Sequence, residues 1–198
     1  YPVGRAPTSV VLGDLDGDGD LDLATTNELA SNVTVLINNG DATFTFSATF
    51  AVGAVPSDLA IGDLDGDGDG DLAVANFIGD DVSVLLSNGD GTFALETRYA
   101  VGARPESLTM GDVDGDGDVD LVVANRNSDN VSVLPNNGDG TFDRDRTYVA
   151  GDLPDFVALG DLDGDGDLDL AVLNVRSDNV GVLINQCGPF DPAIISQP

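Results

Sequence analysis

The chain has 198 residues, enough for one domain with a sizeable core; 41% of them are hydrophobic, 6% are aromatic, and 25 glycines indicate many tight turns. Thirty-six acidic residues against seven arginines, with no lysine or histidine, give a formal charge of −29. A surface of this sign repels phosphate backbones and anionic membranes, which excludes nucleic-acid binding, and no apolar run is long enough to span a membrane.

One unit of 49 residues occurs four times along the chain. The acidic strings GDLDGDGDLDL, GDLDGDGDGDL, GDVDGDGDVDL and GDLDGDGDLDL begin their aspartate runs at Asp14, Asp63, Asp112 and Asp161, without insertion or deletion. A period of this length, filled by short strands and turns, is typical of the blades of a β-propeller. We therefore expect a four-bladed β-propeller over residues 1–186, with repeats 1–49, 50–98, 99–147 and 148–186, and a tail or linker over 187–198.

Each unit predicts four strands, most clearly in the third copy. Residues 107–110 lead into the acidic string, residues 119–124 lead out of it with the apolar run 121–124, and 131–134 alternate as a third strand. After the turn at 137–140, a fourth strand ends near Val149. Pro135 falls where the other copies have isoleucine or leucine, so we expect a bulge or an early strand end there.

The two ends of the chain predict how the blades close into a ring. The fourth copy departs from its siblings at Cys187 and lacks a fourth strand, whereas residues 1–4 match a fourth strand that belongs to no blade. We expect an all-β fold of four four-stranded blades, closed by the N-terminal strand completing the last blade, because closure removes two exposed sheet edges. The alternatives are a ring shared by two chains and a fragment of a longer array; a monomer is expected rather than a ring-sharing dimer.

Each acidic string is a candidate calcium loop. In the first, Asp14, Asp16 and Asp18 can converge on one point, Gly19 permits the sharp turn, the carbonyl of residue 20 can face the same centre, and Asp22 can close the shell. Six or seven hard oxygens suit Ca²⁺, whereas Zn²⁺ prefers His or Cys and Mg²⁺ a tighter octahedron. One ion per repeat gives four. The predicted metal-binding residues are Asp14, Asp16, Asp18, Asp20, Asp22, Asp63, Asp65, Asp67, Asp69, Asp71, Asp112, Asp114, Asp116, Asp118, Asp120, Asp161, Asp163, Asp165, Asp167 and Asp169.

Two other interpretations of the loops fit less well. A hairpin turn needs one or two Asp-Gly residues, not four carboxylates spaced alike in every loop. An EF-hand needs glutamate at its twelfth position, where the first copy has Thr25 and the others valine, and strands flank these loops instead of helices. Four Ca²⁺ ions would change the formal charge from −29 to −21 and relieve the repulsion among the clustered carboxylates.

The string GDLDGDGDLDLAV, together with the turn N-G-D-G-T-F at residues 88–93 and 137–142, resembles the FG-GAP or VCBS-type repeat. That repeat builds the β-propeller of integrin α chains and of modules in secreted bacterial proteins, and the resemblance extends to about Gln186. It implies an extracellular or secreted calcium-binding protein, with a loop between the first two strands of each blade. Side chains at loop positions 1, 3, 5 and 9 and the carbonyl at position 7 would bind the ion. Integrin-type propellers have seven blades, whereas this chain has four.

The expected function is adhesion, or binding of a carbohydrate or protein ligand, by a calcium-stabilised module. Ligand contacts are expected where the copies differ, on the face opposite the loops, and their arginines suit an acidic sugar or a carboxylate-bearing peptide. A structural spacer within a larger secreted protein is the alternative. A polysaccharide-active enzyme is disfavoured, because histidine and lysine are absent and no repeat carries a singular catalytic group. The predicted ligand-binding residues are Arg5, Glu28, Phe77, Arg104, Arg126, Asn127 and Arg176.

Overall fold

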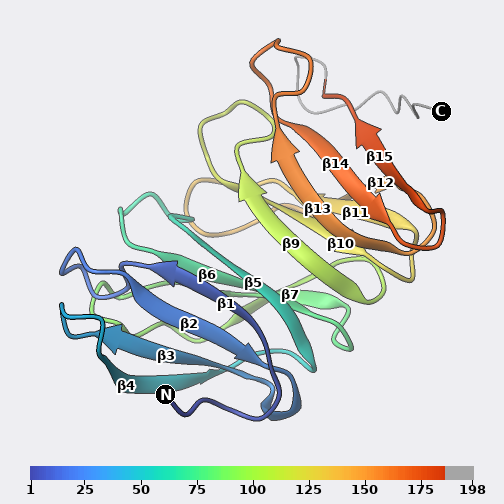
Figure 1. The fold of residues 1–198 in the computed structure, drawn as a ribbon. Coiled ribbons are helices and arrows are strands. Elements are labelled where there is room, and N and C mark those ends of the chain that lie inside the picture. Colours follow the sequence, from blue (N-terminus) through green and yellow to red (C-terminus); the bar gives the residue numbers. More distant parts are fainter. Residues whose placement is uncertain (186–198) are drawn as a thin grey trace.

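The computed structural model describes residues 1–185, which form four antiparallel sheets set side by side in an arc (Figure 1). Each sheet is a blade in which consecutive strands are neighbours. The strands of blade 1 are β1 (Pro7–Gly13), β2 (Asp22–Asn27), β3 (Asn32–Asn38) and β4 (Phe44–Ala51). Those of blade 2 are β5 (Pro56–Gly62), β6 (Asp71–Asn76), β7 (Asp81–Leu85) and β8 (Thr97–Ala100). Those of blade 3 are β9 (Pro105–Gly111), β10 (Asp120–Asn125), β11 (Asn130–Leu134) and β12 (Arg146–Val149). Blade 4 contains β13 (Pro154–Gly160), β14 (Asp169–Asn174) and β15 (Asn179–Leu183).

The apolar runs predicted to be buried strands are the second strands of the blades. Every residue of β6 and β10 is buried, because these strands have a strand on each side and a neighbouring blade on each face. The third strands β7 and β11, which alternate valine and serine, are buried except for their first residue, whereas no residue of the outer strands β8 and β12 is buried. The four-strand unit predicted from the repeat is therefore confirmed in blades 1 to 3.

The hydrophobic core lies between the blades, in three clusters. One joins blade 1 to blade 2, for example through Val33 and Leu59; the next joins blade 2 to blade 3, and the last joins blade 3 to blade 4. Two of these junctions also contain edge-to-face aromatic pairs. The ring centroids are 5.1 Å apart for Phe50 and Phe93 and 5.2 Å apart for Tyr99 and Phe142. Each blade is thus stabilised chiefly by its neighbours along the chain.

Pro135 coincides with the end of a strand but does not explain it. Strand β11 ends at Leu134, directly before the proline, as predicted. Strands β7 and β15 end at the equivalent residues, Leu85 and Leu183, where no proline follows. In blade 1 the equivalent strand β3 continues to Asn38, so an end at this position is shared by blades 2 to 4 and does not require a proline.

The predicted closure by the N-terminal strand does not occur in the described residues. Blade 4 has three strands, and residues 1–6 lie beside blade 1, where the Tyr1 ring packs edge-to-face on Phe44 with centroids 5.4 Å apart. The N–H of Glu28 donates to the carbonyl of Ala6 at 2.9 Å, which holds the same segment on blade 1. Figure 1 places the N-terminus beside β4, at the far end of the arc from β15.

The part of the chain that the structure describes contains one helix, the 3₁₀ turn η1 (Glu28–Ala30), and none that could cross a membrane. The predicted tail at 187–198 lies outside the described residues, and residue 186 is the first beyond them.

Candidate functional site

Each predicted calcium loop connects the first two strands of its blade, as the sequence predicts. In blade 1 the loop runs from the end of β1 to the start of β2, which pair at Gly13 and Asp22. Gly17 and Gly19 have φ angles of +78° and +91°, a left-handed backbone that glycine adopts without strain. The equivalent glycines of the other three loops have the same conformation, so the four loops curl alike.

The curl brings carboxylate oxygens together in all four loops. In the first loop, oxygens of Asp14, Asp16 and Asp18 lie within 4.8 Å of one another. In the other three loops the cluster consists of positions 1, 3 and 9. These clusters are Asp63, Asp65 and Asp71; Asp112, Asp114 and Asp120; and Asp161, Asp163 and Asp169. The aspartates at position 7 are in none of the clusters, consistent with the expectation that this position offers its carbonyl.

Backbone hydrogen bonds fix the position of the first aspartate in each loop. Asp14 accepts from the N–H of Gly17 at 2.8 Å and from that of Gly19 at 2.9 Å, one with each carboxylate oxygen. The same pair of bonds forms at Asp63, Asp112 and Asp161. The loop backbone therefore positions its first carboxylate without help from a neighbouring side chain.

The aspartate at position 9 also binds backbone groups, a role that the sequence analysis did not predict. Asp71 is fully buried, and its two oxygens accept from the N–H of Leu64 at 2.8 Å and from that of Ser87 at 2.7 Å. Asp22, Asp120 and Asp169 make the same two bonds. This carboxylate joins the loop to a residue at or shortly after the end of the blade's third strand, and in the last three loops it also belongs to the acidic cluster.

The electrostatics of the loops favour a bound cation. The pKa of Asp71 is raised to about 6, chiefly by burial and also by the nearby carboxylates of Asp65 and Asp67, while its backbone hydrogen bonds act in the opposite direction. Burial likewise raises the pKa of Asp120 to about 6. One buried oxygen of Asp114, within the third cluster, has no hydrogen-bond partner. Clustered carboxylates with spare lone pairs and no nitrogen or sulfur donor fit a hard divalent ion such as Ca²⁺.

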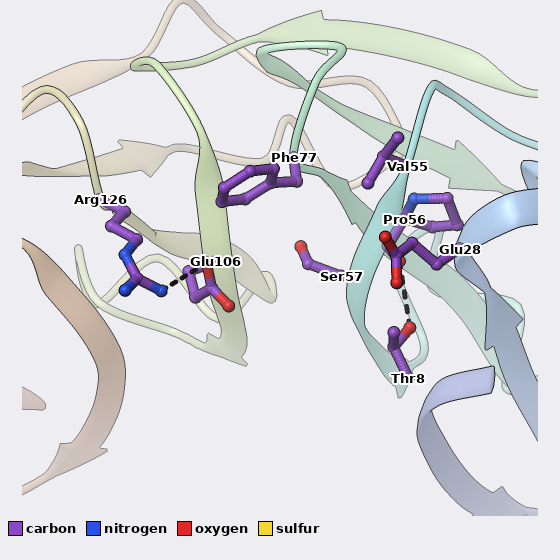
Figure 2. Close-up of a pocket in the computed structure, with 8 residues that line it drawn as sticks. All are labelled: Thr8, Glu28, Val55, Pro56, Ser57, Phe77, Glu106 and Arg126. Atoms are coloured by element: carbon purple, nitrogen blue, oxygen red, sulfur yellow. Dashed lines mark hydrogen bonds and ion pairs between the residues drawn. The ribbon is translucent and has the colours of Figure 1, made fainter. Parts of the chain in front are cut away.

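A pocket of about 390 Å³ lies at the opposite end of the same strands (Figure 2). Strand β1 begins there and ends at its acidic loop, and β2 runs back, so about 20 Å of strand separates the two ends. Blades 1 to 3 all contribute to the pocket. Its lining residues are Thr8, Glu28, Val55, Pro56, Ser57, Phe77, Glu106 and Arg126.

Two arginines beside the pocket are already engaged. Arg126 forms ion pairs of 3.2 Å with Glu106 and 2.9 Å with Asp155, which joins blade 3 to blade 4. The guanidinium of Arg104 lies over the ring of Phe77, 5.2 Å from its centroid. Figure 2 shows Phe77 and Arg126 on either side of Glu106. Because its charge is compensated by two carboxylates, Arg126 is less suited to an acidic ligand than the sequence alone suggested.

The structure brings together part of the predicted ligand face. Glu28, Phe77 and Arg126 line the pocket, and Arg104 touches it through Phe77. Arg5, Asn127 and Arg176 are exposed and are not among the lining residues. The sequence analysis missed the residues that directly follow the repeated proline, which differ between copies as the other candidates do and so carried a usable signal. These residues are Thr8, Ser57, Glu106 and Asp155.

Comparisons with known proteins agree with the repeat and the fold. A family model described as an FG-GAP-like repeat matches residues 14–74, 63–123 and 112–172. The comparison with curated proteins gives no match. Among solved structures of β-propeller type, an Agrocybe aegerita lectin, described as recognising non-reducing terminal N-acetylglucosamine, is 28% identical, with a TM-score of 0.61 over 91% of this chain and 50% of that chain.

Two further structures are similar at lower identity. A catalytically inactive virginiamycin B lyase from Staphylococcus aureus is 16% identical, with a TM-score of 0.62 over 98% of this chain and 56% of that chain. The V. cholerae biofilm matrix protein Bap1 is 22% identical, with a TM-score of 0.56 over 90% of this chain and 26% of that chain. The chain spans about half the length of the lectin and of the lyase. The similarities to the lyase and to the biofilm matrix protein, both below 25% identity, concern the fold alone.

Proposed function

Because the chain belongs to the FG-GAP-like repeat family, we propose that it is a calcium-stabilised module that binds a carbohydrate in the pocket formed by blades 1 to 3. One observation carries the proposal: the first two strands of these blades have an acidic cluster at one end and the pocket at the other. An ion in the cluster would fix the strands whose opposite ends present the pocket residues. The proposed place of action is outside the cell, where calcium is abundant.

The loops would bind Ca²⁺ through side chains at positions 1, 3, 5 and 9 and the carbonyl at position 7. The cation would supply charge compensation for carboxylates whose repulsion otherwise destabilises the folded chain. In the first loop the side-chain ligands would be Asp14, Asp16, Asp18 and Asp22, with the carbonyl of Asp20. The chain's own hydrogen bonds already hold the first and last of these in place.

The pocket favours a neutral sugar over a charged ligand. Phe77 offers a half-buried aromatic ring, against which the apolar face of a pyranose can pack, and Glu28 and Glu106 offer hydrogen-bond acceptors for hydroxyl groups. Arg126 donates to Glu106 at 3.2 Å, which orients that carboxylate. The lectin among the similar structures supports a carbohydrate ligand.

A glycan array probed with the labelled chain in calcium buffer tests this function. We expect binding to a restricted set of glycans, lost by at least tenfold in Phe77→Ala and retained in Phe46→Ala, which removes an exposed ring outside the pocket. The same glycans incubated with the chain should remain intact, since we propose a binding module and not an enzyme. Absence of binding to every glycan would refute the ligand proposal and favour a spacer, and product formation would identify an enzyme.

A further inference from the structure

A residue shortly after the third strand of blade 3 links the acidic loop of its own blade to the loop of blade 2. This residue is Asn136, which is 4% exposed. Its backbone N–H donates to Asp120, the last aspartate of its own loop, at 2.8 Å. Its side-chain Nδ2 donates, also at 2.8 Å, to the carbonyl of Leu64 in the loop of blade 2. One buried asparagine therefore joins two neighbouring acidic loops.

The same link joins blades 3 and 4. Asn185, the repeat equivalent of Asn136, is 3% exposed. Its N–H donates to Asp169, the last aspartate of the loop of blade 4, at 2.8 Å. Its Nδ2 donates to the carbonyl of Val113, in the loop of blade 3, at 2.7 Å. Two junctions of the chain thus contain a link of the same chemistry.

The second residue of a loop receives this link. Leu64 places its side chain, 1% exposed, in the core between blades 2 and 3, while its N–H donates to Asp71 at 2.8 Å. Its carbonyl accepts from Asn136 and from the N–H of Gly140, at 2.9 Å, in the turn N-G-D-G-T-F of blade 3. The loop cannot move at Leu64 without disturbing both its own buried aspartate and the junction with the next blade.

These bonds form one continuous path through the loops of blades 2, 3 and 4. Each step joins an N–H or an Nδ2 to an oxygen, over 2.7 to 2.9 Å. Bonds in a buried network strengthen one another, so the three loops should hold their conformations together. The path runs from Asp71 through Leu64, Asn136, Asp120, Val113 and Asn185 to Asp169.

The path is interrupted between blades 1 and 2, where Ser87 is the equivalent residue. Its N–H donates to Asp71 at 2.7 Å, but its hydroxyl accepts from the N–H of Gly89, at 3.1 Å, within its own turn. The described residues show no bond from this side chain to blade 1. The carbonyl of Leu15, in the loop of blade 1, accepts instead from the N–H of Gly91 at 2.8 Å. The loop of blade 1 is therefore joined to its neighbour without the direct link to an aspartate.

We propose that Asn136 and Asn185 are positioning residues that couple the proposed calcium sites, so that the loops of blades 2, 3 and 4 bind their ions cooperatively and the loop of blade 1 fills separately. This inference rests on the calcium binding proposed above. An ion orders the loop that it binds, and a neighbouring loop that is already held through shared bonds costs less to order. By linkage, an ion in either of two joined loops strengthens binding in the other by the same factor.

Electrostatics act in the opposite direction. Each bound Ca²⁺ reduces the negative charge that attracts the next ion to a chain of charge −29. At about 0.15 M salt, interactions between exposed charges are largely screened beyond about 8 Å, whereas interactions between buried groups are screened much less. The coupling through buried bonds should therefore prevail at this ionic strength. We expect it to raise the affinity of a neighbouring loop by roughly fivefold to tenfold, within the usual range for coupled sites.

Equilibrium dialysis of the whole chain against radioactive calcium at about 0.15 M salt tests the proposal. We expect four ions per chain and a Hill coefficient of about 1.5, because three coupled sites are measured together with one separate site. Asn136→Ser, which introduces the residue that blade 2 has at this position, should lower the coefficient. Combined with Asn185→Ser, it should bring the coefficient to about 1.

Ser87→Asn tests the coupling without removing a bond. The longer side chain should donate to the carbonyl of Leu15, as Asn136 donates to Leu64, and should raise the Hill coefficient above that of the wild type. The matched control is Asn137→Ser. Asn137 is exposed and its Nδ2 donates to Thr141, at 3.0 Å, within its own turn, so this change should leave the coefficient as it is.

The Hill coefficient distinguishes coupling from a purely structural role. If Asn136 only stabilised the fold, Asn136→Ser would lower Tm and leave the coefficient unchanged, and this result would overturn the proposal. A wild-type chain that binds four ions with a coefficient of 1 or less would also overturn it, while leaving the proposed calcium binding intact. A chain that binds no calcium would refute the proposed function and the coupling together.

Discussion

The two ends of each blade differ in how the four repeats use them. At the loop end all four carry the same aspartates and the same left-handed glycines, and the same hydrogen bonds recur. At the pocket end the equivalent residues differ: Glu28, Phe77, Arg126 and Val175 at one position, and Thr8, Ser57, Glu106 and Asp155 at the other. The loop end, which is alike in all four repeats, thus maintains the blades. The opposite end, whose residues differ between repeats, forms one pocket. Changes at the loop end should therefore affect stability, and changes at the pocket end should affect binding.

Removing the metal should have the largest effect, because it acts on all four loops at once. Sites with dissociation constants of roughly 10⁻⁴–10⁻³ M would each contribute about 0.4–1.4 kcal/mol at about 1 mM calcium. We expect EDTA to lower Tm by on the order of 10 °C or more, measured by differential scanning calorimetry. Added Mg²⁺ should restore less of the loss than Ca²⁺. An unchanged Tm after chelation would show that the loop end does not depend on a metal.

A substitution within one loop separates the buried aspartate from its neighbour. In Asp71→Asn the amide must face the N–H of Leu64 or of Ser87, leaving a buried donor without an acceptor at a cost of about 1–3 kcal/mol, in addition to the weakened ion site. Asp69→Asn removes the same charge from a side chain outside the cluster and should cost little. Urea denaturation in calcium compares the two. Equal losses would contradict the special position of Asp71.

The pH dependence of stability should change sign with the metal. The pKa values of Asp71 and Asp120 are raised to about 6 in the folded chain, above the ordinary 3.8. Their contribution to stability is therefore complete below about pH 3.8 and is lost as the pH rises through about 6. In EDTA, the free energy of unfolding should increase between pH 7 and about pH 5; in calcium, protons compete with the ion and the added stability should shrink.

The matched variant for this pH effect is Asp71→Asn combined with Asp120→Asn. It lacks both titrating groups, so its stability in EDTA should vary less with pH over this range, as followed by urea denaturation. A wild-type chain that loses stability on acidification in EDTA would contradict the assignment.

The smallest effect on stability is expected at the pocket end. Arg126→Met removes ion pairs with Glu106 and Asp155 that are about a third exposed, so the expected loss is at most about 1 kcal/mol. Arg98→Met, which removes a 2.7 Å pair with Glu96 away from the pocket, is the matched control. Both should unfold at similar urea concentrations, whereas glycan binding should fall only in the Arg126 variant. A much larger stability loss at Arg126 would mean that the pocket end also maintains the fold.

The strands and loops could be predicted from the sequence because one unit is repeated without insertion. Four copies of a pattern distinguish what the fold requires from what a single loop happens to contain. The second role of Asp71, as acceptor for two N–H groups, could not be predicted. It depends on how close the N–H of Ser87, which follows the third strand of blade 2, comes to the Asp71 carboxylate.

Pocket and closure depend on how blades are placed relative to one another, which the repeat alone does not specify. Ser57 and Glu106 occupy one repeat position, yet only the arc shows that they line the same pocket. The sequence predicts a fourth strand at residues 1–4, whereas the structure assigns no strand there and places the Tyr1 ring against Phe44 of blade 1.

The most direct test of the ions at the loop end is an anomalous difference map from crystals of the chain grown in calcium chloride. The account predicts four peaks per chain, each surrounded by oxygens at about 2.3–2.6 Å and each lying among the first, third and fifth or ninth residues of its loop. Loops without peaks, or peaks located away from the aspartate clusters, would contradict it.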